Sequence, residues 1–185
     1  MNAIVPVSAR PTAVAVAQTQ IEEQTQYLTF MLGGETFAIG ILGIKEIIEY
    51  HGLTEVPMMP ACIRGVINLR GAVVPVLDLA ARFGKPSSEV SKKTCIVIVE
   101  VQSGEDRHDM GVVVDAVNAV LEIPASEIEP PPSFGARIRS DFIEGMGKVA
   151  GKFVILLNVN QVLSTEELGA LGQVAGSADG ALTGN

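Results

Sequence analysis

Apolar and polar residues alternate in short runs between residues 27 and 158, and glycines or charged residues separate the runs. A period of two residues places one face of each segment in a core and is typical of β-strands. Residues 41–49 also fit a helical face, but β-branched residues dominate them, which favours a one-turn corner at 41–43 and then a strand. The expected strands are 27–32, 36–39, 44–50, two strands within 63–79, 94–101, 110–115, 117–123, 144–150 and 152–158. The pattern predicts an all-β fold with short helices.

The connections between these strands carry the remaining short elements. We expect a helical turn at 79–83, a charged turn at 103–109 and a long proline-rich connection at 124–141. Ser164 and Glu167 form a capping-box pair, which predicts a helix over 164–171. Residues 1–25 and 172–185 lack a regular pattern and are expected to be flexible tails. The folded region is therefore 26–171.

The folded region contains an internal repeat. Residues 63–79 align with 143–159 at an offset of 80, and glycines match at Gly65/Gly145 and Gly71/Gly151. Upstream, 39–49 aligns with 112–122 at an offset of 73. Each copy has too few strands for a robust core of its own. We therefore expect two five-stranded barrel subdomains, 27–83 and 94–159, that share a hydrophobic core.

The two copies differ at a pair of charged positions. Arg70 is matched by Ala150, and Glu46 is matched by Ala119. We expect Glu46 and Arg70 to form an ion pair between strands. Two interpretations remain open and compatible: a structural ion pair, or a pair that shapes a binding surface. If the pair is partly buried, removal of one partner would destabilise the fold by roughly 3–5 kcal/mol.

Charge and composition narrow the classes of partner. The formal net charge of −8 offers no basic face for phosphates, so a nucleic-acid module and binding to an anionic membrane are both disfavoured. No run approaches the ~18 apolar residues of a membrane-spanning helix. The two cysteines, Cys62 and Cys95, lie among apolar residues and are expected to be reduced thiols in a cytosolic protein.

Motifs that carry chemistry are missing from the sequence. The two histidines follow no metal-ligand spacing, and no Cys-x-x-Cys pair is present, so we expect no metal. The Gly145–Gly151 segment has the wrong spacing for a dinucleotide loop and precedes a strand, so we expect no cofactor. No Gly-x-Ser-x-Gly elbow occurs. The sequence favours a binding module over an enzyme, and a small-ligand barrel is a much weaker alternative.

Several segments together resemble a known family. They are 26–30, 37–39, 44–47, the Asn-Leu-Arg-Gly corner at 68–71 followed by Val-Pro-Val-Leu-Asp-Leu at 74–79, 111–115, 141–147, 155–158 and 164–168. Together they resemble the CheW family of bacterial chemotaxis coupling proteins over about 26–171. The resemblance implies two SH3-like β-barrels around a shared core. It also implies a non-enzymatic cytoplasmic adaptor that joins methyl-accepting chemoreceptor tips to the regulatory domain of the histidine kinase CheA in membrane-associated arrays. An adaptor of a twitching or surface-sensing system is the alternative.

The resemblance also assigns contact residues. It implies receptor contact at one set of positions, in a groove between the subdomains, and kinase contact at another set, mainly on the second barrel. The receptor positions are Ile44, Glu46, Gly65, Arg70, Gly71, Val117, Val120 and Gly145, and the kinase positions are Thr94, Cys95 and Ile96.

Overall fold

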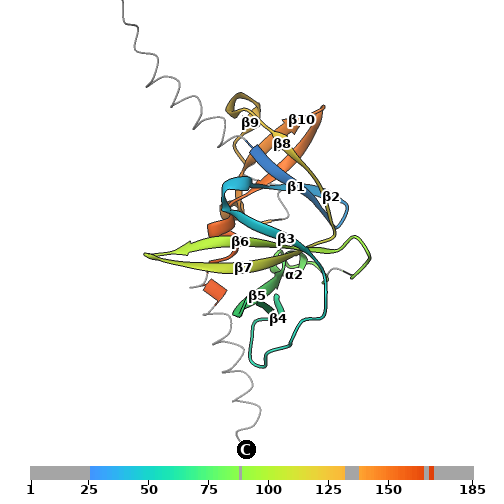
Figure 1. Cartoon of the computed structure of the whole chain (residues 1–185). Helices are drawn as coiled ribbons and strands as arrows, with labels where there is room; N and C mark the ends of the chain where they lie inside the picture. Colours follow the sequence, from blue (N-terminus) through green and yellow to red (C-terminus); the bar gives the residue numbers. More distant parts are fainter. Residues whose placement is uncertain (1–25, 88, 132–137, 165–166, 169–185) are drawn as a thin grey trace, which may run out of the picture.

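The structure is a computed structural model that describes residues 26–87, 89–131, 138–164 and 167–168. The two tails expected from the sequence lie outside these residues, as does most of the expected helix at 164–171. Glu167 and Leu168 are helical, and the Glu167 amide donates to Ser164 Oγ at 3.4 Å. The described part of the chain consists mainly of strands, which are joined by loops and a few short helical turns (Figure 1).

The strands are β1 (Gln26–Leu32), β2 (Glu35–Gly40), β3 (Ile44–Glu49), β4 (Ile63–Leu69), β5 (Ala72–Asp78), β6 (Cys95–Ser103), β7 (Asp106–Val114), β8 (Ala116–Glu122), β9 (Ile128–Glu129), β10 (Ile143–Val149) and β11 (Lys152–Leu157). The helical turns are η1 (Ile41–Gly43), α2 (Leu79–Arg82), η2 (Ala125–Glu127), η3 (Ser140–Phe142) and α3 (Val159–Val162). The corner at 41–43 and the turn after β5 agree with the sequence pattern, whereas α3 was not predicted.

The strands form two sheets, and equivalent strands follow the same order in both. One has six strands in the order β8-β1-β2-β11-β10-β9, and the other has five in the order β3-β6-β7-β5-β4. Removing β9 leaves two equivalent sets, because the repeat relates β3 to β8, β4 to β10 and β5 to β11. Each sheet has one parallel contact at the equivalent place, β5 with β7 and β11 with β2. The repeat in the sequence is therefore a repeat in three dimensions.

The sheets do not follow the contiguous segments 27–83 and 94–159. The β1–β2 hairpin from the first segment belongs to the six-stranded sheet, and the β6–β7 hairpin from the second segment belongs to the five-stranded sheet. The expected assignment of strands to barrels is therefore wrong for these two hairpins. A hairpin satisfies its own internal ladder locally, so its sequence does not specify which larger sheet it joins. The exchange interlocks the two subdomains.

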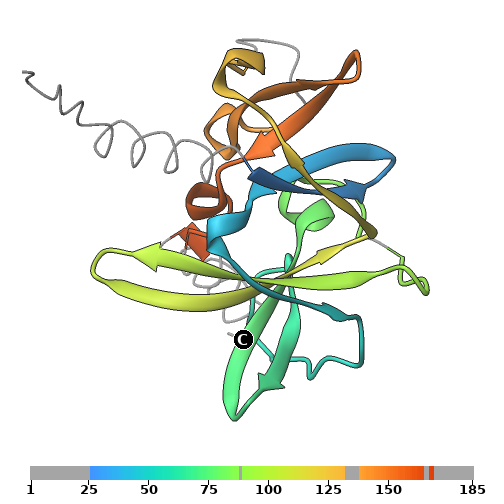
Figure 2. The same ribbon diagram turned by 45° about the horizontal axis from the view of Figure 1, so that its top comes forward.

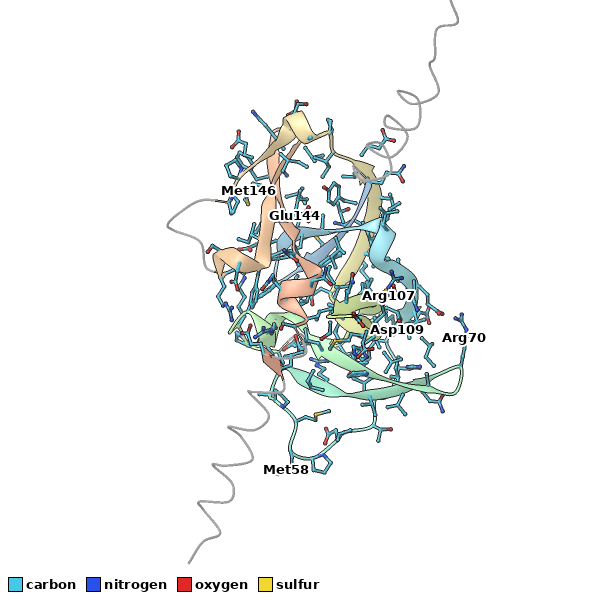
Figure 3. All side chains as sticks on the ribbon, turned by 90° about the vertical axis from the view of Figure 1, so that its left-hand side faces the viewer. Met58, Arg70, Arg107, Asp109, Glu144 and Met146 are labelled. Atoms are coloured by element: carbon cyan, nitrogen blue, oxygen red, sulfur yellow. The ribbon has the colours of Figure 1, made fainter. Side chains whose placement is uncertain are left out.

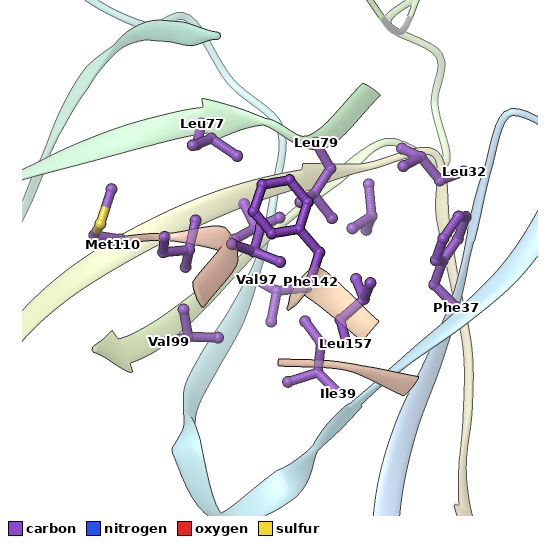
Figure 4. Packing of buried hydrophobic residues seen from close by; sticks show 14 of the residues in the cluster. Leu32, Phe37, Ile39, Leu77, Leu79, Val97, Val99, Met110, Phe142 and Leu157 are labelled. Atoms are coloured by element: carbon purple, nitrogen blue, oxygen red, sulfur yellow. The ribbon is translucent and has the colours of Figure 1, made fainter. Parts of the chain in front are cut away.

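Three apolar clusters result from this arrangement. One lies inside each barrel, and a larger one lies between the two sheets. β6 illustrates the division, since Ile96 and Ile98 face the interior of the five-stranded barrel while Val97 and Val99 face the shared cluster. Figure 4 shows the shared cluster, with Phe142 packed among side chains from both sheets. The prediction of a mainly β fold with two subdomains around a shared core is confirmed.

The charged segment 103–109 is not the expected turn. β6 continues to Ser103 and β7 begins at Asp106, so only two residues form the turn. β3 pairs with β6 only as far as Val99, and β5 pairs with β7 only from Gly111. The hairpin therefore projects beyond its neighbours, as Figure 2 shows. Its residues are polar because both faces of the projecting hairpin are exposed. We took this polar stretch for a turn in the sequence.

Candidate protein-binding surface

Arg70 and Gly71 occupy the tip of the β4–β5 hairpin. Their φ angles are 53° and 85°, which is the pattern of a type I′ turn, and Asn68 Oδ1 accepts a hydrogen bond of 2.9 Å from the Gly71 amide. Ala150 and Gly151 form the same turn in the second copy, with φ angles of 51° and 77°. The backbone conformation is therefore a property of the repeated fold. What distinguishes the first copy is the side chain of Arg70.

The ion pair expected between Arg70 and Glu46 is present. Arg70 Nη2 lies 3.0 Å from Glu46 Oε2, and the two side chains are 79% and 25% exposed. Figure 3 shows Arg70 projecting at the edge of the molecule. A pair this exposed contributes about 0–1 kcal/mol, so the larger figure for a partly buried pair does not apply. The guanidinium retains donors that face solvent, which suits a contact with a partner.

Gly65 and Gly145 are buried and have structural roles. A Cβ atom at Gly65 would lie 2.5 Å from the carbonyl oxygen of Thr54, whose backbone pairs with Val66 and closes the five-stranded barrel. At Gly145 a Cβ atom would lie 2.7 Å from the Cγ2 atom of Ile128 in β9. Both glycines permit a close approach of the segment that closes a barrel. This explains the shared glycine register of the repeat.

The remaining predicted receptor residues divide between the two sheets. Ile44 and Val117 are half-buried and pack against the shared core, whereas Val120 is exposed. Ile44 begins β3, the strand that also carries Glu46, and the two valines lie on β8, its counterpart in the repeat. The structure therefore groups Ile44 with the Glu46–Arg70 pair. Val117 and Val120 lie at the equivalent edge of the other sheet.

The predicted kinase residues are largely buried. Thr94 is 2% exposed and Ile96 is wholly buried, while Cys95 between them is half-buried. Cys95 and Ile96 belong to β6 in the five-stranded sheet, and not to the barrel assembled from the second copy. β6 is paired on both sides, by β3 and β7, so it offers no free edge over these residues. Cys95 is the member of this set whose side chain reaches the surface.

Exposed apolar side chains occur at equivalent places on the two sheets, and the sequence reasoning missed most of them. Ile47 on β3 corresponds to Val120 on β8, and Val73 on β5 corresponds to Phe153 on β11. All four are exposed. Alternation identifies the two faces of a strand but not which face another layer covers. The sequence did contain one signal for these exposed side chains, because both copies of the repeat carry an apolar residue at the same outward-facing position.

A cleft of about 850 Å³ lies where the six-stranded sheet meets η1 and α3. Its lining includes Tyr27, Leu42, Glu144 and Asn158 but none of the predicted receptor or kinase residues. Glu144 reaches solvent, yet the surrounding walls desolvate it, and this raises the pKa of its carboxyl above the ordinary value. The pKa of the Tyr27 phenol is also raised, mainly because the phenol is partly buried and to a lesser extent because of the negative charge of Glu144.

Replacement of Glu144 with glutamine is expected to raise the thermal unfolding midpoint at pH 7. The folded-state pKa of Glu144 is raised, so the folded chain holds this proton more tightly than the unfolded chain, and the ionised form costs stability above that pKa. The difference from wild type should shrink as the pH falls towards 4, where both states are protonated. Glu105→Gln, in the exposed β6–β7 turn, is the control and should leave the unfolding midpoint unchanged at pH 7 and at pH 4. An unfolding midpoint that falls at pH 7 would contradict this account.

Two further features of the described residues bear on function. No group of three or more histidine, cysteine or acidic side chains in this part of the chain is placed to hold a metal ion. Among the same residues, no helix has the length and apolar character needed to cross a membrane.

Comparison with known proteins identifies the family. The family model described as the CheW-like domain matches residues 26–167, which includes both sheets. The chain belongs to the CheW-like family. The resemblance seen in the corner at 68–71 and in the segments around it is thereby confirmed, together with the class of function, a chemotaxis coupling adaptor.

Individual CheW proteins match along most of their length. The chain is 32% identical over 152 residues to chemotaxis protein CheW of Klebsiella aerogenes, a match that covers 82% of this chain and 89% of that protein. It is 33% identical to CheW of Bacillus subtilis, covering 80% and 92%. The crystal structure of the scaffolding protein TtCheW from Thermoanaerobacter tengcongensis superimposes with a TM-score of 0.68 at 34% identity, covering 75% of this chain and 87% of that one. Protein FrzA of Myxococcus xanthus is 28% identical, covering 84% and 94%.

Proposed function

We propose that this chain is a non-enzymatic adaptor that joins the cytoplasmic tips of methyl-accepting chemoreceptors to a CheA-type histidine kinase. It acts by association, at the cytoplasmic face of the membrane, where receptors hold it in an array. Membership in the CheW-like family supports the class of function. The proposed site rests on the exposed Arg70, which pairs with Glu46 on the rim of one barrel. The second copy of the repeat has alanine at the equivalent position.

The receptor contact is proposed at the outer face of β3 and the β4–β5 tip. Arg70 and Gly71 would contact the receptor directly, and Glu46 would hold the guanidinium in place. Val120 would add an exposed apolar contact from β8. Ile44 and Val117 would support these strands from the core side. A charged donor beside apolar anchors suits a helical tip that presents both kinds of side chain.

The kinase contact is proposed around Cys95 at the start of β6. Thr94 and Ile96 would act indirectly, because their side chains are buried and fix the path of this segment. The Thr94 hydroxyl accepts a hydrogen bond of 2.8 Å from the Ser91 amide, which holds the preceding loop against the strand. A kinase domain of related double-barrel fold would meet this rim as one barrel against another. Array geometry would raise the effective concentration of such a weak contact.

Arg70→Ala is expected to weaken binding to a chemoreceptor tip fragment by about tenfold or more, because a charge-assisted hydrogen bond contributes about 1.5–3 kcal/mol. The measurement is a pull-down or calorimetric titration with the receptor fragment and, separately, with the kinase regulatory domain. Arg107→Ala is the matched control, since Arg107 is also an exposed arginine in an ion pair, with Glu100 at 3.2 Å. Both variants should lose no more than about 1 kcal/mol of stability.

Unchanged receptor binding by folded Arg70→Ala would refute the receptor site. Failure of the wild-type chain to bind either partner would refute the proposed function as a whole. Binding only to partners from a twitching or surface-sensing system would instead favour the alternative adaptor role, which the match to Protein FrzA leaves open.

A further inference from the structure

The repeat places opposite charges at equivalent positions on β4 and β10. Arg64 on β4 corresponds to Glu144 on β10 at the offset of 80. Their neighbours on the paired strands correspond too, since Asp78 ends β5 and Asn158 follows β11. Asp78 and Asn158 perform the same task, because each side chain caps the helical turn that follows it. Because the surrounding backbone is equivalent in the two copies, the opposite charges of Arg64 and Glu144 can be compared directly.

In the five-stranded subdomain, this position is occupied by the chain's own cation. Arg64 Nε donates to Asp78 Oδ2 at 3.0 Å, and Arg64 Nη1 donates to the Tyr50 hydroxyl at 3.3 Å. The carboxylate of Asp78 is wholly buried and the side chain of Arg64 is only 17% exposed. An internal guanidinium is therefore neutralised and covered at this place.

In the six-stranded subdomain, the equivalent position carries a carboxylate that forms no ion pair within the described part of the chain. Glu144 has no ion pair with any described residue, and neutral Asn158 stands where the other copy has Asp78. Figure 3 shows Glu144 on β10, in the subdomain away from the Arg70 tip. The guanidinium present in one copy is missing from the other, and its counterpart is a carboxylate.

Glu144 lies in the wall of the cleft of about 850 Å³, and the chemistry of that cleft is one-sided. Its apolar lining includes Ile39, Ile41, Leu42 and Leu157, and the described residues that line it include no lysine, arginine or histidine. The second carboxylate in the lining, Glu100, is already paired with Lys45 at 3.2 Å and Arg107 at 3.2 Å. Among the described residues of the lining, Glu144 is therefore the carboxylate without an ion pair, and the apolar walls beside it desolvate it.

We propose that this cleft binds an arginine side chain of a protein partner. The guanidinium pairs with the Glu144 carboxylate, and the aliphatic part of the arginine lies against the apolar wall formed by Ile39, Ile41 and Leu157. Arginine suits the site because its stem is apolar and its head forms two parallel hydrogen bonds with a carboxylate. The bound arginine supplies a cation at the place equivalent to that of Arg64 in the five-stranded subdomain. The lining contains none of the receptor and kinase residues proposed above, although Gly43 directly precedes Ile44 in the chain.

The test uses the full chain labelled with ¹⁵N and two blocked tripeptides, acetyl-Leu-Arg-Leu-amide and the same peptide with citrulline, the neutral isostere of arginine. The amides of Gly40 and Gly43, which line the cleft, report binding through their chemical shifts. The arginine peptide should bind about tenfold more tightly than the citrulline peptide, as expected for a charge-assisted contact. Glu144→Gln should remove this preference, whereas Glu105→Gln should keep it.

Equal affinities for the two peptides would mean that the cleft binds apolar side chains without distinguishing a charged from a neutral head group. This result would overturn the proposal. No shift at millimolar peptide, or a preference that survives Glu144→Gln, would overturn it as well. The experiment contains neither receptor nor kinase, so its outcome is independent of the proposed adaptor function.

Discussion

Replacing Asp78 with alanine is expected to lower the free energy of unfolding by about 3–5 kcal/mol, since it removes one partner of a buried ion pair. Asp78 is wholly buried and accepts from Arg64 Nε at 3.0 Å. The variant would leave the guanidinium of Arg64 largely covered and without this carboxylate. It would also remove the cap of α2, because the Ala81 amide donates to Asp78 Oδ1 at 3.3 Å. Urea unfolding followed by circular dichroism measures the loss.

The second copy supplies the matched control. Asn158→Ala removes the equivalent cap, in which the Gln161 amide donates to Asn158 Oδ1 at 3.3 Å, but it breaks no ion pair. Its expected loss is about 1 kcal/mol. Asp78→Asn separates the two effects, since an amide can still cap α2 while the charge is gone. Equal losses for Asp78→Ala and Asn158→Ala would show that the buried ion pair contributes nothing beyond the cap.

Gly65→Ala is expected to destabilise the chain by about 1–3 kcal/mol through overpacking, and to loosen the closure of the five-stranded barrel. The added methyl group would lie 2.5 Å from the carbonyl oxygen of Thr54, a backbone atom that cannot rotate away. Two hydrogen bonds join Thr54 and Val66, at 3.0 and 2.8 Å, and would have to lengthen. Chemical denaturation gives the stability, and faster hydrogen exchange at the Val66 amide reports the local opening.

Two other glycines calibrate this result. Gly145→Ala should cost less than Gly65→Ala, because its closest contact is the Cγ2 methyl group of Ile128, a side-chain atom that can shift. Gly40→Ala meets nothing within 4 Å and should lie within about 0.5 kcal/mol of wild type. A Gly65→Ala protein as stable as wild type would contradict the close approach at Thr54. A loss of receptor binding in Gly65→Ala would reflect the altered fold, since Gly65 is buried.

Local patterns predicted the features that depend on near neighbours in the chain. Alternation located most strands to within a few residues, and the comparison of the two copies predicted the ion pair between Glu46 and Arg70. The corner at 68–71 was recognised in the sequence between two apolar strands, and the structure places Arg70 and Gly71 there in a left-handed backbone conformation. In each case, the signal and the structure it specifies lie within one hairpin or one pair of repeats.

Features set by contacts distant in sequence could not be predicted in this way. The sheet that each hairpin joins depends on the parallel pairs β5–β7 and β2–β11, and parallel pairing leaves no mark on a single strand. The burial of Ile96 depends on the barrel that closes over β6, so a family position at a strand start was taken for a surface contact. The cleft beside Glu144 is assembled from segments between Gln26 and Asn160, and no local pattern marks it.

The exchanged hairpins have a mechanical consequence. A parallel ladder holds each exchanged hairpin within its sheet, and a change in the angle between the subdomains would expose the apolar cluster between them. No single connecting segment can act as a hinge, because each subdomain keeps two strands of the other's sequence half within its own sheet. We expect an adaptor built in this way to move as a rigid body when a partner shifts or rotates it. We therefore expect a signal that crosses it to depend on its position and its contacts, rather than on a change in its own shape.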